Sequence, residues 1–244
     1  VLPFRFSEGT WSLGTRGPVT LRIGEVENLV TARNITADLQ GDYPWTEDNP
    51  LLLTNVKVET LGGKITMQQL RMPQHDPALL RVDNISSSEL ISAVNPKQFA
   101  MSGPVSGALP FWLDNEKWII KDGWLTNPGP MTLRIDKDTA DAIVKDNMVA
   151  GAAINWLRYM EISRSWTRIN LDNLGELTMQ ATIKGTSRVD GKSSSVNLNY
   201  THDENVFTLW RSLRFGDNLQ TWFEQHAAIP APRSLTGKES EEQQ

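Results

Sequence analysis

Two aspartates, Asp114 and Asp122, come nearest in this sequence to a catalytic pair by residue type and spacing. Paired carboxylates flanking a substrate are what glycoside hydrolases use as general acid and nucleophile. Each aspartate, however, begins a dipeptide that reverse turns favour, Asp114-Asn115 and Asp122-Gly123, because a short polar side chain hydrogen-bonds to nearby backbone. Turn chemistry explains both residues, so we predict no catalytic residue and no enzymatic activity.

The other residues that commonly carry chemistry are absent or scattered. The chain has no cysteine, and its three histidines, His75, His202 and His226, lie far apart, without the spacing of paired metal ligands. The segment 103–107 contains Pro104, which lacks the backbone N–H group that a phosphate-binding loop requires. The sequence therefore predicts neither a metal ion nor a cofactor.

Tryptophan is unusually frequent, with nine tryptophans against three tyrosines. Most lie beyond residue 110, namely Trp112, Trp118, Trp124, Trp156, Trp166, Trp210 and Trp222. One interpretation is core packing, with indole N–H groups reaching a partner at the edge of the core. The other is an aromatic lining of an apolar groove, or contact with a membrane interface. We favour packing, because aromatic stripes are more often part of a core.

The segment 103–135 shows which elements must position these residues. Apolar and polar residues alternate in three short runs, which predicts β-strands with one apolar face. The apolar positions are Leu109, Phe111 and Leu113, then Trp118 and Ile120, then Met131, Leu133 and Ile135. Turn signals separate the runs, the strongest being Asn127-Pro128-Gly129-Pro130. We predict an antiparallel meander, around which the rest of the chain is organised.

Similar alternation predicts strands along most of the remaining chain. A hairpin on Gly62-Gly63 would place Val56, Val58, Ile65 and Met67 on one face. A last hairpin would contain Leu177, Met179 and Ile183 and then Val196, Leu198 and Tyr200, joined by the polar stretch 185–195. The predicted fold class is mainly β, an elongated antiparallel sheet with short helices toward the C-terminus.

Several stretches are predicted not to be strands. Ser86, Ser87 or Ser88 caps a short helix that runs through Val94. Helical spacing of apolar residues predicts further helices near 137–160 and 205–226. Residues 227–244 are rich in proline and then in charge, so we predict a disordered tail after a single β domain over residues 1–226.

The composition and net charge of the chain argue against some classes of function. With 244 residues, 39% apolar and 22% charged, the chain has an ordinary globular composition. A net charge of -5 argues against wholesale binding to nucleic acid or anionic lipid headgroups, which need a basic face. No run of about eighteen apolar residues occurs, and the chain begins with Val1, so we expect a mature product or a piece of a longer protein.

A set of residues in and around the central meander resembles a known family. The residues are Ser102-Gly103, Gly107, Leu109-Pro110, Ile119 or Ile120, Asp122-Gly123, Leu125 and Gly129, together with Gly62-Gly63 and the ending LWRSLRFGDNLQTWFE. This arrangement is similar to the C-terminal signature of AsmA-like bridge proteins, most closely the YdbH-like family. The resemblance covers nearly the whole chain.

The resemblance implies a structure and a function. Proteins of this kind are long sheets curled into a U-shaped groove whose apolar inner face carries phospholipid acyl chains between the inner and outer membranes. An N-terminal helix anchors them in the inner membrane, and they span the periplasm. At the outer membrane they dock a small lipoprotein, which adds strands to the sheet.

On this resemblance we assign candidate residues. The predicted groove lining is Leu109, Phe111, Leu113, Trp118, Ile120, Met131, Leu133, Ile135, Val56, Val58, Ile65, Met67, Leu177, Met179 and Ile183. The predicted partner-binding residues are Val196, Leu198 and Tyr200, although helices at 205–226 are an alternative cover for that edge. The alternative function is a non-enzymatic β-sandwich that binds a ligand or mediates adhesion, with a closed core and no lipid cargo.

Overall fold

The computed structural model describes residues 4–7, 10–15, 17–27, 30–94, 99–135, 159–189 and 191–207. The chain divides into one unit of residues 1–205 and a second of residues 206–244. The first half contains β1 (Phe4–Ser7), β2 (Thr10–Gly14), β3 (Val19–Val26), β4 (Ala32–Gln40), β5 (Asp42–Tyr43), β6 (Leu51–Thr60), β7 (Gly63–Met72), β8 (Ala78–Ser86) and helix α1 (Ser87–Val94). The second half contains β9 (Phe99–Ser102), β10 (Pro104–Phe111), β11 (Trp118–Thr126), β12 (Met131–Ile135), β13 (Tyr159–Asp172), β14 (Glu176–Val189) and β15 (Lys192–Asn205).

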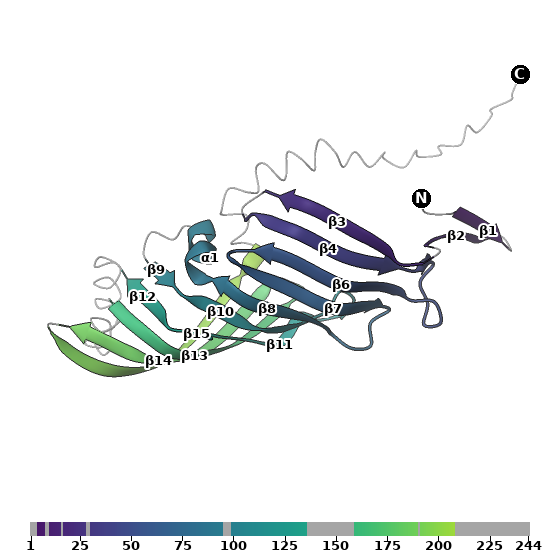
Figure 1. Cartoon of the computed structure of the whole chain (residues 1–244). Coiled ribbons are helices and arrows are strands. Elements are labelled where there is room, and N and C mark those ends of the chain that lie inside the picture. Colours follow the sequence, from purple (N-terminus) through teal and green to yellow (C-terminus); the bar gives the residue numbers. More distant parts are fainter. Residues whose placement is uncertain are drawn as a thin grey trace, which may run out of the picture. The chain divides into compact units, whose positions relative to one another are not determined.

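These strands build one large antiparallel sheet and one small one (Figure 1). The small sheet joins β1, β2 and β5. The large sheet follows the order β15-β14-β13-β11-β10-β8-β7-β6-β4-β3, and in addition β12 pairs with β13 and β9 pairs with β12. Its end strands β15 and β3 do not pair with each other, so the sheet is open. The predicted mainly β class with an antiparallel sheet is confirmed.

The hairpin of β6 and β7 is confirmed, with its turn one residue earlier than predicted. Leu61 and Gly62 form the two-residue loop with φ angles of 50° and 69°, while Gly63 already pairs with Thr60. Two successive positive φ angles are those of a type I′ turn, which matches the twist of the flanking strands. The two strands then pair along their whole length, from Thr60 with Gly63 to Leu51 with Met72.

The short helix predicted after residues 86–88 is confirmed as α1. The Ser86 hydroxyl accepts a hydrogen bond from the Glu89 backbone N–H at 3.3 Å, so Ser86 is the N-cap and Glu89 stands at the third helical position. The Ser86 backbone N–H donates to the Leu61 carbonyl at 2.7 Å, and that of Ser87 donates to the Gly103 carbonyl at 3.0 Å. These bonds fix the end of β8 between the β6–β7 turn and the start of β10.

The central meander is built from two long, interrupted strands. β9 and β10 are separated by Gly103 alone, and β11 and β12 by residues 127–130. β9 pairs with β12 and β10 pairs with β11, so both interruptions lie at the same level of the sheet. The Asn127 side-chain N–H donates to the Gly129 carbonyl at 2.7 Å and the Asn127 oxygen accepts from the Ser165 hydroxyl at 2.9 Å. The predicted stop at residues 127–130 thus bends the strand without ending the sheet.

Four of the bulges that interrupt the pairing contain a residue with left-handed backbone. Asn34, Asn55, Asn84 and Asp122 have φ angles between 50° and 54°, and each lies beside a shift of register with a neighbouring strand. Asparagine and aspartate tolerate this left-handed backbone better than other residues with a Cβ. A bulge bends a strand and increases its twist, so the large sheet is not flat.

The last three strands differ from prediction in length. β13 begins at Tyr159, so the last two residues of the helix predicted near 137–160 are in a strand, and the remainder lies outside the described residues. The polar stretch 185–195 is not a loop: β14 continues to Val189, which pairs with Lys192 at the start of β15. Asn205 ends β15 and two residues of helical backbone follow, while the rest of the helix predicted near 205–226 and the tail 227–244 lie outside the described residues.

Candidate functional site

One face of the large sheet is apolar from β3 to β15. Residues that pair directly across neighbouring antiparallel strands point to the same face, so rows of partners show what that face carries. One row runs Val58, Ile65, Val82, Gly107, Leu125, Thr167, Ala181 and Tyr200, across every strand from β6 to β15. A second runs Ala78, Phe111, Ile120, Leu171 and Leu177. A third runs Val19, Leu39, Leu53 and Leu70.

Two clusters join these rows into one surface. In the first, Met67, Leu70 and Ala78 are buried and half-buried neighbours including Val56, Leu80 and Phe111 pack on them. In the second, Met131, Met160 and Ile162 are buried beneath Leu133, Ile183 and Val196. We call the resulting surface the apolar face. Its members are Val19, Leu21, Ile23, Ile35, Ala37, Leu39, Leu53, Val56, Val58, Ile65, Met67, Leu70, Ala78, Leu80, Val82, Leu109, Phe111, Ile120, Leu125, Met131, Leu133, Met160, Ile162, Ile169, Leu171, Leu177, Met179, Ala181, Ile183, Val196, Leu198 and Tyr200.

The apolar face is only half covered by the described residues. Ten hydrophobic side chains are buried among them, and most members of the face are of intermediate exposure. On β3 the side chains of Val19, Leu21 and Ile23 are 41%, 43% and 49% exposed. Extensive contacts between described elements join hydrogen-bonded neighbours, or α1 with β8 and β9. A closed β-sandwich would bury this face under a second sheet, whereas the described strands leave it accessible.

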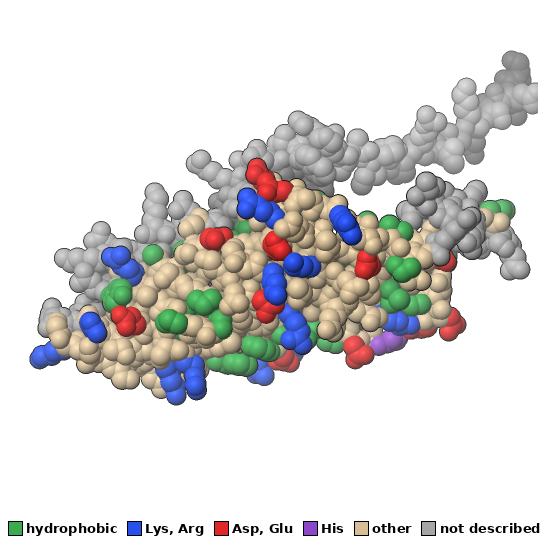
Figure 2. Space-filling model, viewed as in Figure 1, with side chains coloured by type: hydrophobic (Ala, Val, Ile, Leu, Met, Phe, Trp, Pro, Cys, Tyr) green, Lys and Arg blue, Asp and Glu red, His purple; other side chains and the backbone are tan. Residues whose placement is uncertain are grey.

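The opposite face of the sheet is polar and charged. Arg33 pairs with Glu25 at 2.6 Å, Lys57 with Glu59 at 2.9 Å and Lys64 with Asp83 at 4.0 Å. Figure 2 shows Lys and Arg side chains interspersed with Asp and Glu on the surface in view. Hydrogen bonding by Lys57 and then Asn34 lowers the pKa of the Glu59 carboxyl from its ordinary value. The two faces therefore differ sharply, one apolar and the other strongly hydrated.

Most predicted lining residues lie on the apolar face, and two do not. Leu109, Phe111, Ile120, Met131, Leu133, Val56, Val58, Ile65, Met67, Leu177, Met179 and Ile183 belong to it, and Ile135 follows Leu133 by two residues in β12. Leu113 lies in the loop after β10 and is 59% exposed. Trp118 pairs with Asp172 whereas Ile120 pairs with Leu171, so a bulge puts these two on opposite faces. The ammonium groups of Lys117 and Lys121 lie over the Trp118 ring, at 4.9 and 4.3 Å from its centroid.

The predicted partner-binding residues lie on β15, which ends the described sheet. Val196, Leu198 and Tyr200 pair with Gly185, Ile183 and Ala181 of β14, so their side chains continue the apolar face. Among the described residues no strand pairs with the other side of β15. Such an edge presents backbone N–H and C=O groups along fourteen residues.

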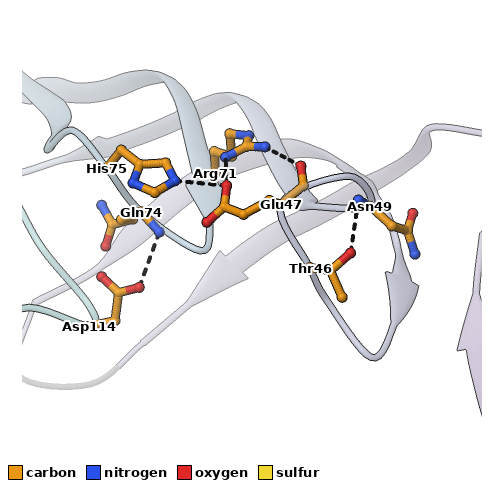
Figure 3. Close-up of polar contacts among 7 residues, drawn as sticks. All are labelled: Thr46, Glu47, Asn49, Arg71, Gln74, His75 and Asp114. Atoms are coloured by element: carbon orange, nitrogen blue, oxygen red, sulfur yellow. Dashed lines mark hydrogen bonds and ion pairs between the residues drawn. The ribbon is translucent and has the colours of Figure 1, made fainter.

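Asp114 and Asp122, considered as a carboxylate pair, have separate local partners. Asp114 accepts a hydrogen bond from the Gln74 backbone N–H at 3.1 Å (Figure 3). In the same view Glu47 contacts His75 Nε2 at 2.7 Å and an Arg71 guanidinium nitrogen at 3.1 Å, and these hydrogen bonds, that of His75 foremost, lower the pKa of Glu47. Asp122 lies at a bulge and pairs with Arg168 at 3.5 Å. These contacts tie loops and strands together.

Sequence reasoning missed several members of the apolar face. Val19, Leu21 and Ile23 alternate cleanly with polar residues, and that signal was sufficient to include them. Ile162 and Ile169 of β13 share the face although they are seven positions apart, because the pairing with β14 shifts between Ile162 and Arg164. A bulge of that kind hides the alternation, so no simple period identifies β13.

Comparison with known proteins assigns this fold to a family. Residues 1–228 match the family model described as YdbH-like, intermembrane phospholipid transport protein YdbH. Over all 244 residues the chain is 77% identical to the probable phospholipid transport protein YdbH of Escherichia coli strain K12, and it spans 28% of that protein's length. No solved structure matches the chain. In the described ranges, no helix is long and apolar enough to cross a membrane. The chain belongs to the YdbH-like family of lipid transport proteins.

Proposed function

We propose that the apolar face of this chain carries phospholipid acyl chains as part of a longer protein that moves phospholipid between the inner and outer membranes. The observation that carries the proposal is the set of mainly apolar rows that together extend from β3 to β15, which the described residues leave half exposed. Membership of a family of phospholipid transport proteins supports the same conclusion. The expected location is the periplasm, with the longer protein anchored in the inner membrane.

The physical basis is burial of the acyl chain. Each CH₂ group that leaves water for an apolar surface gains about 0.8 kcal/mol. A surface of constant apolar character along its length offers an acyl chain similar free energies at successive positions, so the chain slides without a high barrier. The polar headgroup stays in water beside the sheet. No bond is made or broken, so the proposed function requires no catalytic residue, metal or cofactor.

We test the proposal by native mass spectrometry of the gently purified chain, with lipid extraction from the same sample. The variant Met179→Arg/Ile183→Arg places two charges on the apolar face of β14, and we expect it to lose co-purifying phospholipid. A matched control, Gln180→Arg/Thr186→Arg, adds the same charge to the exposed polar side of that strand. We expect the control to retain lipid as the unmodified chain does, because its apolar face is unchanged.

A second pair of substitutions tests the same apolar face at positions where the added charges should not unfold the chain. Leu21→Arg/Ile23→Arg acts at positions that are 43% and 49% exposed, where an added charge stays in water and costs little stability. Urea unfolding of every variant verifies the fold. If folded apolar-face variants keep as much phospholipid as the control, or if the unmodified chain carries none, the apolar face is not an acyl-chain surface.

We further propose that β15 docks a small outer-membrane lipoprotein by strand addition. Support comes from its position at the end of the described sheet and from its length of fourteen residues, which offers a long backbone ladder. An added strand would carry the apolar face onward from Val196, Leu198 and Tyr200 toward the partner.

A further inference from the structure

The polar face of the large sheet carries a stacked tryptophan pair, in which Trp166 is exposed and Trp124 is half-buried. Trp124 of β11 and Trp166 of β13 stack with nearly parallel rings, 9° between planes and 4.9 Å between centroids. Trp166 pairs with Thr126 and Thr182, whereas its neighbour Ser165 pairs with Ile183 of the apolar face. The stack therefore points away from the proposed acyl-chain surface. Trp166 remains 51% exposed, which is unusual for so large an apolar side chain on a polar surface.

Cations surround this tryptophan pair. Arg164 and Arg168 flank Trp166 along β13, and Lys184 of β14 pairs directly with Arg164. Arg168 forms an ion pair with Asp122, while in the described part of the chain no carboxylate lies within ion-pair distance of Arg164 or Lys184. The nearest acidic residue along the strand is Glu161, which pairs with Thr186. In a chain of net charge -5, two uncompensated cations beside an exposed indole form a local site for an anion.

The rest of the surface offers neutral hydrogen-bonding groups. Gln180 pairs with Arg168, and Thr182 donates to the Asn199 side-chain oxygen at 3.1 Å. Small hydroxyl and amide side chains continue across β15, where Asn197, Asn199 and Thr201 are exposed. The surface thus combines the Trp166 ring, on which a ligand can stack, with the cations of Arg164 and Lys184 and with several amide and hydroxyl side chains.

We propose that this surface, centred on Trp166, binds an acidic glycan. A pyranose ring packs its C–H bonds flat against an indole, a contact that buries apolar area and uses the negative ring face. Arg164 and Lys184 would pair with carboxylates of the glycan, and Thr182, Gln180 and Asn199 would bond its hydroxyl and acetamido groups. An anionic membrane fits less well, because Trp166 lies in the middle of β13, between β11 and β14, and not on a loop that projects from the sheet. The proposal is independent of the acyl-chain function.

The test is co-sedimentation of the whole chain with purified peptidoglycan sacculi, an insoluble glycan polymer that carries free carboxylates on its attached peptides. We expect saturable binding that weakens as salt is raised, and a loss of about tenfold in affinity for Trp166→Ala, as for a central aromatic contact. Trp45→Ala is the matched control, since Trp45 is 43% exposed and lies in the segment between β5 and β6. The control should bind sacculi as the unmodified chain does.

Two further arms separate glycan binding from other causes. Arg164→Gln/Lys184→Gln should weaken binding to sacculi, while binding to chitin, a neutral polymer of the same kind of sugar, should be unchanged by it. Anionic phosphatidylglycerol vesicles should not compete with sacculi for the chain. Equal sedimentation of Trp166→Ala and Trp45→Ala, absence of binding to sacculi, or competition by the vesicles would each overturn the proposal, and none of these outcomes bears on lipid carriage by the apolar face.

Discussion

At the scale of single residues, two glycines of the family signature, Gly63 and Gly107, stand where two backbones approach closely. A Cβ atom on Gly107 would collide with the backbone carbonyl oxygen of Trp124, and one on Gly63 would collide with that of Asp83. A Cβ on Gly123 would come within 2.8 Å of Leu109 Cδ2, on the apolar face. The signature thus includes two of the sheet's closest approaches between strand backbones.

The close approach at Gly107 predicts the effect of adding a methyl group there. Gly107→Ala should lower the free energy of unfolding by about 1–3 kcal/mol, because the new Cβ meets backbone that has no room to withdraw. Gly24→Ala is the control, since Gly24 is also in a strand but has no atom within 4 Å of its Cβ position, and its effect should stay within about 0.5 kcal/mol. Urea unfolding measures both. Similar stability of the two variants would contradict the close approach at Gly107.

At the scale of elements, alternation predicted strands well wherever the pairing is regular and failed at bulges. The β6–β7 hairpin follows from Val56, Val58, Ile65 and Met67 because no bulge shifts those four positions relative to one another. Trp118 and Ile120 appear in sequence to share a face, yet the shift in register with β13 separates them. Bulges depend on contacts between strands that are distant in sequence, so local periodicity does not reveal them.

Strand addition at β15 makes a prediction about two adjacent residues. Backbone N–H groups of neighbouring residues in a strand point to opposite edges. Of Leu198→Pro and Asn199→Pro, one should therefore remove a bond to β14 and lower stability, while the other removes a donor from the outer edge and leaves stability nearly unchanged.

The outer-edge variant should lose binding of the lipoprotein partner, measured by pull-down, because the added strand loses a bond and meets the proline ring. The inner-edge variant reports the cost of breaking the β14–β15 ladder and serves as the comparison. Full partner binding by a folded outer-edge variant would move the docking site to another strand.

At the scale of the whole described sheet, the sequence indicated that the strands have an apolar face but not how far that face extends across the sheet. Each strand's apolar positions are visible locally, whereas their alignment into rows that cross from β6 to β15 depends on register, which bulges and turn lengths set. Accessibility is likewise invisible in sequence, because a leucine beneath a second sheet and a leucine on an open face have the same pattern. The family resemblance supplied the expectation of an open sheet, and the pairing order agrees with it.

An open apolar face has a thermodynamic consequence that distinguishes it from a closed core. A ligand that binds only the folded state stabilises it by RT ln(1 + [L]/Kd), about 2.7 kcal/mol at a ligand concentration of 100 times Kd.

We therefore expect lysophosphatidylcholine, below the concentration at which it forms micelles, to raise the urea midpoint of the chain in a dose-dependent way. Leu21→Arg/Ile23→Arg should reduce this shift, since the two charges interrupt the face on β3, where its side chains are exposed. Glycerophosphocholine, which has the same headgroup and no acyl chain, should produce no shift. A midpoint that lysophosphatidylcholine leaves unchanged would mean that the face is covered in solution, and acyl chains would then have no access to it.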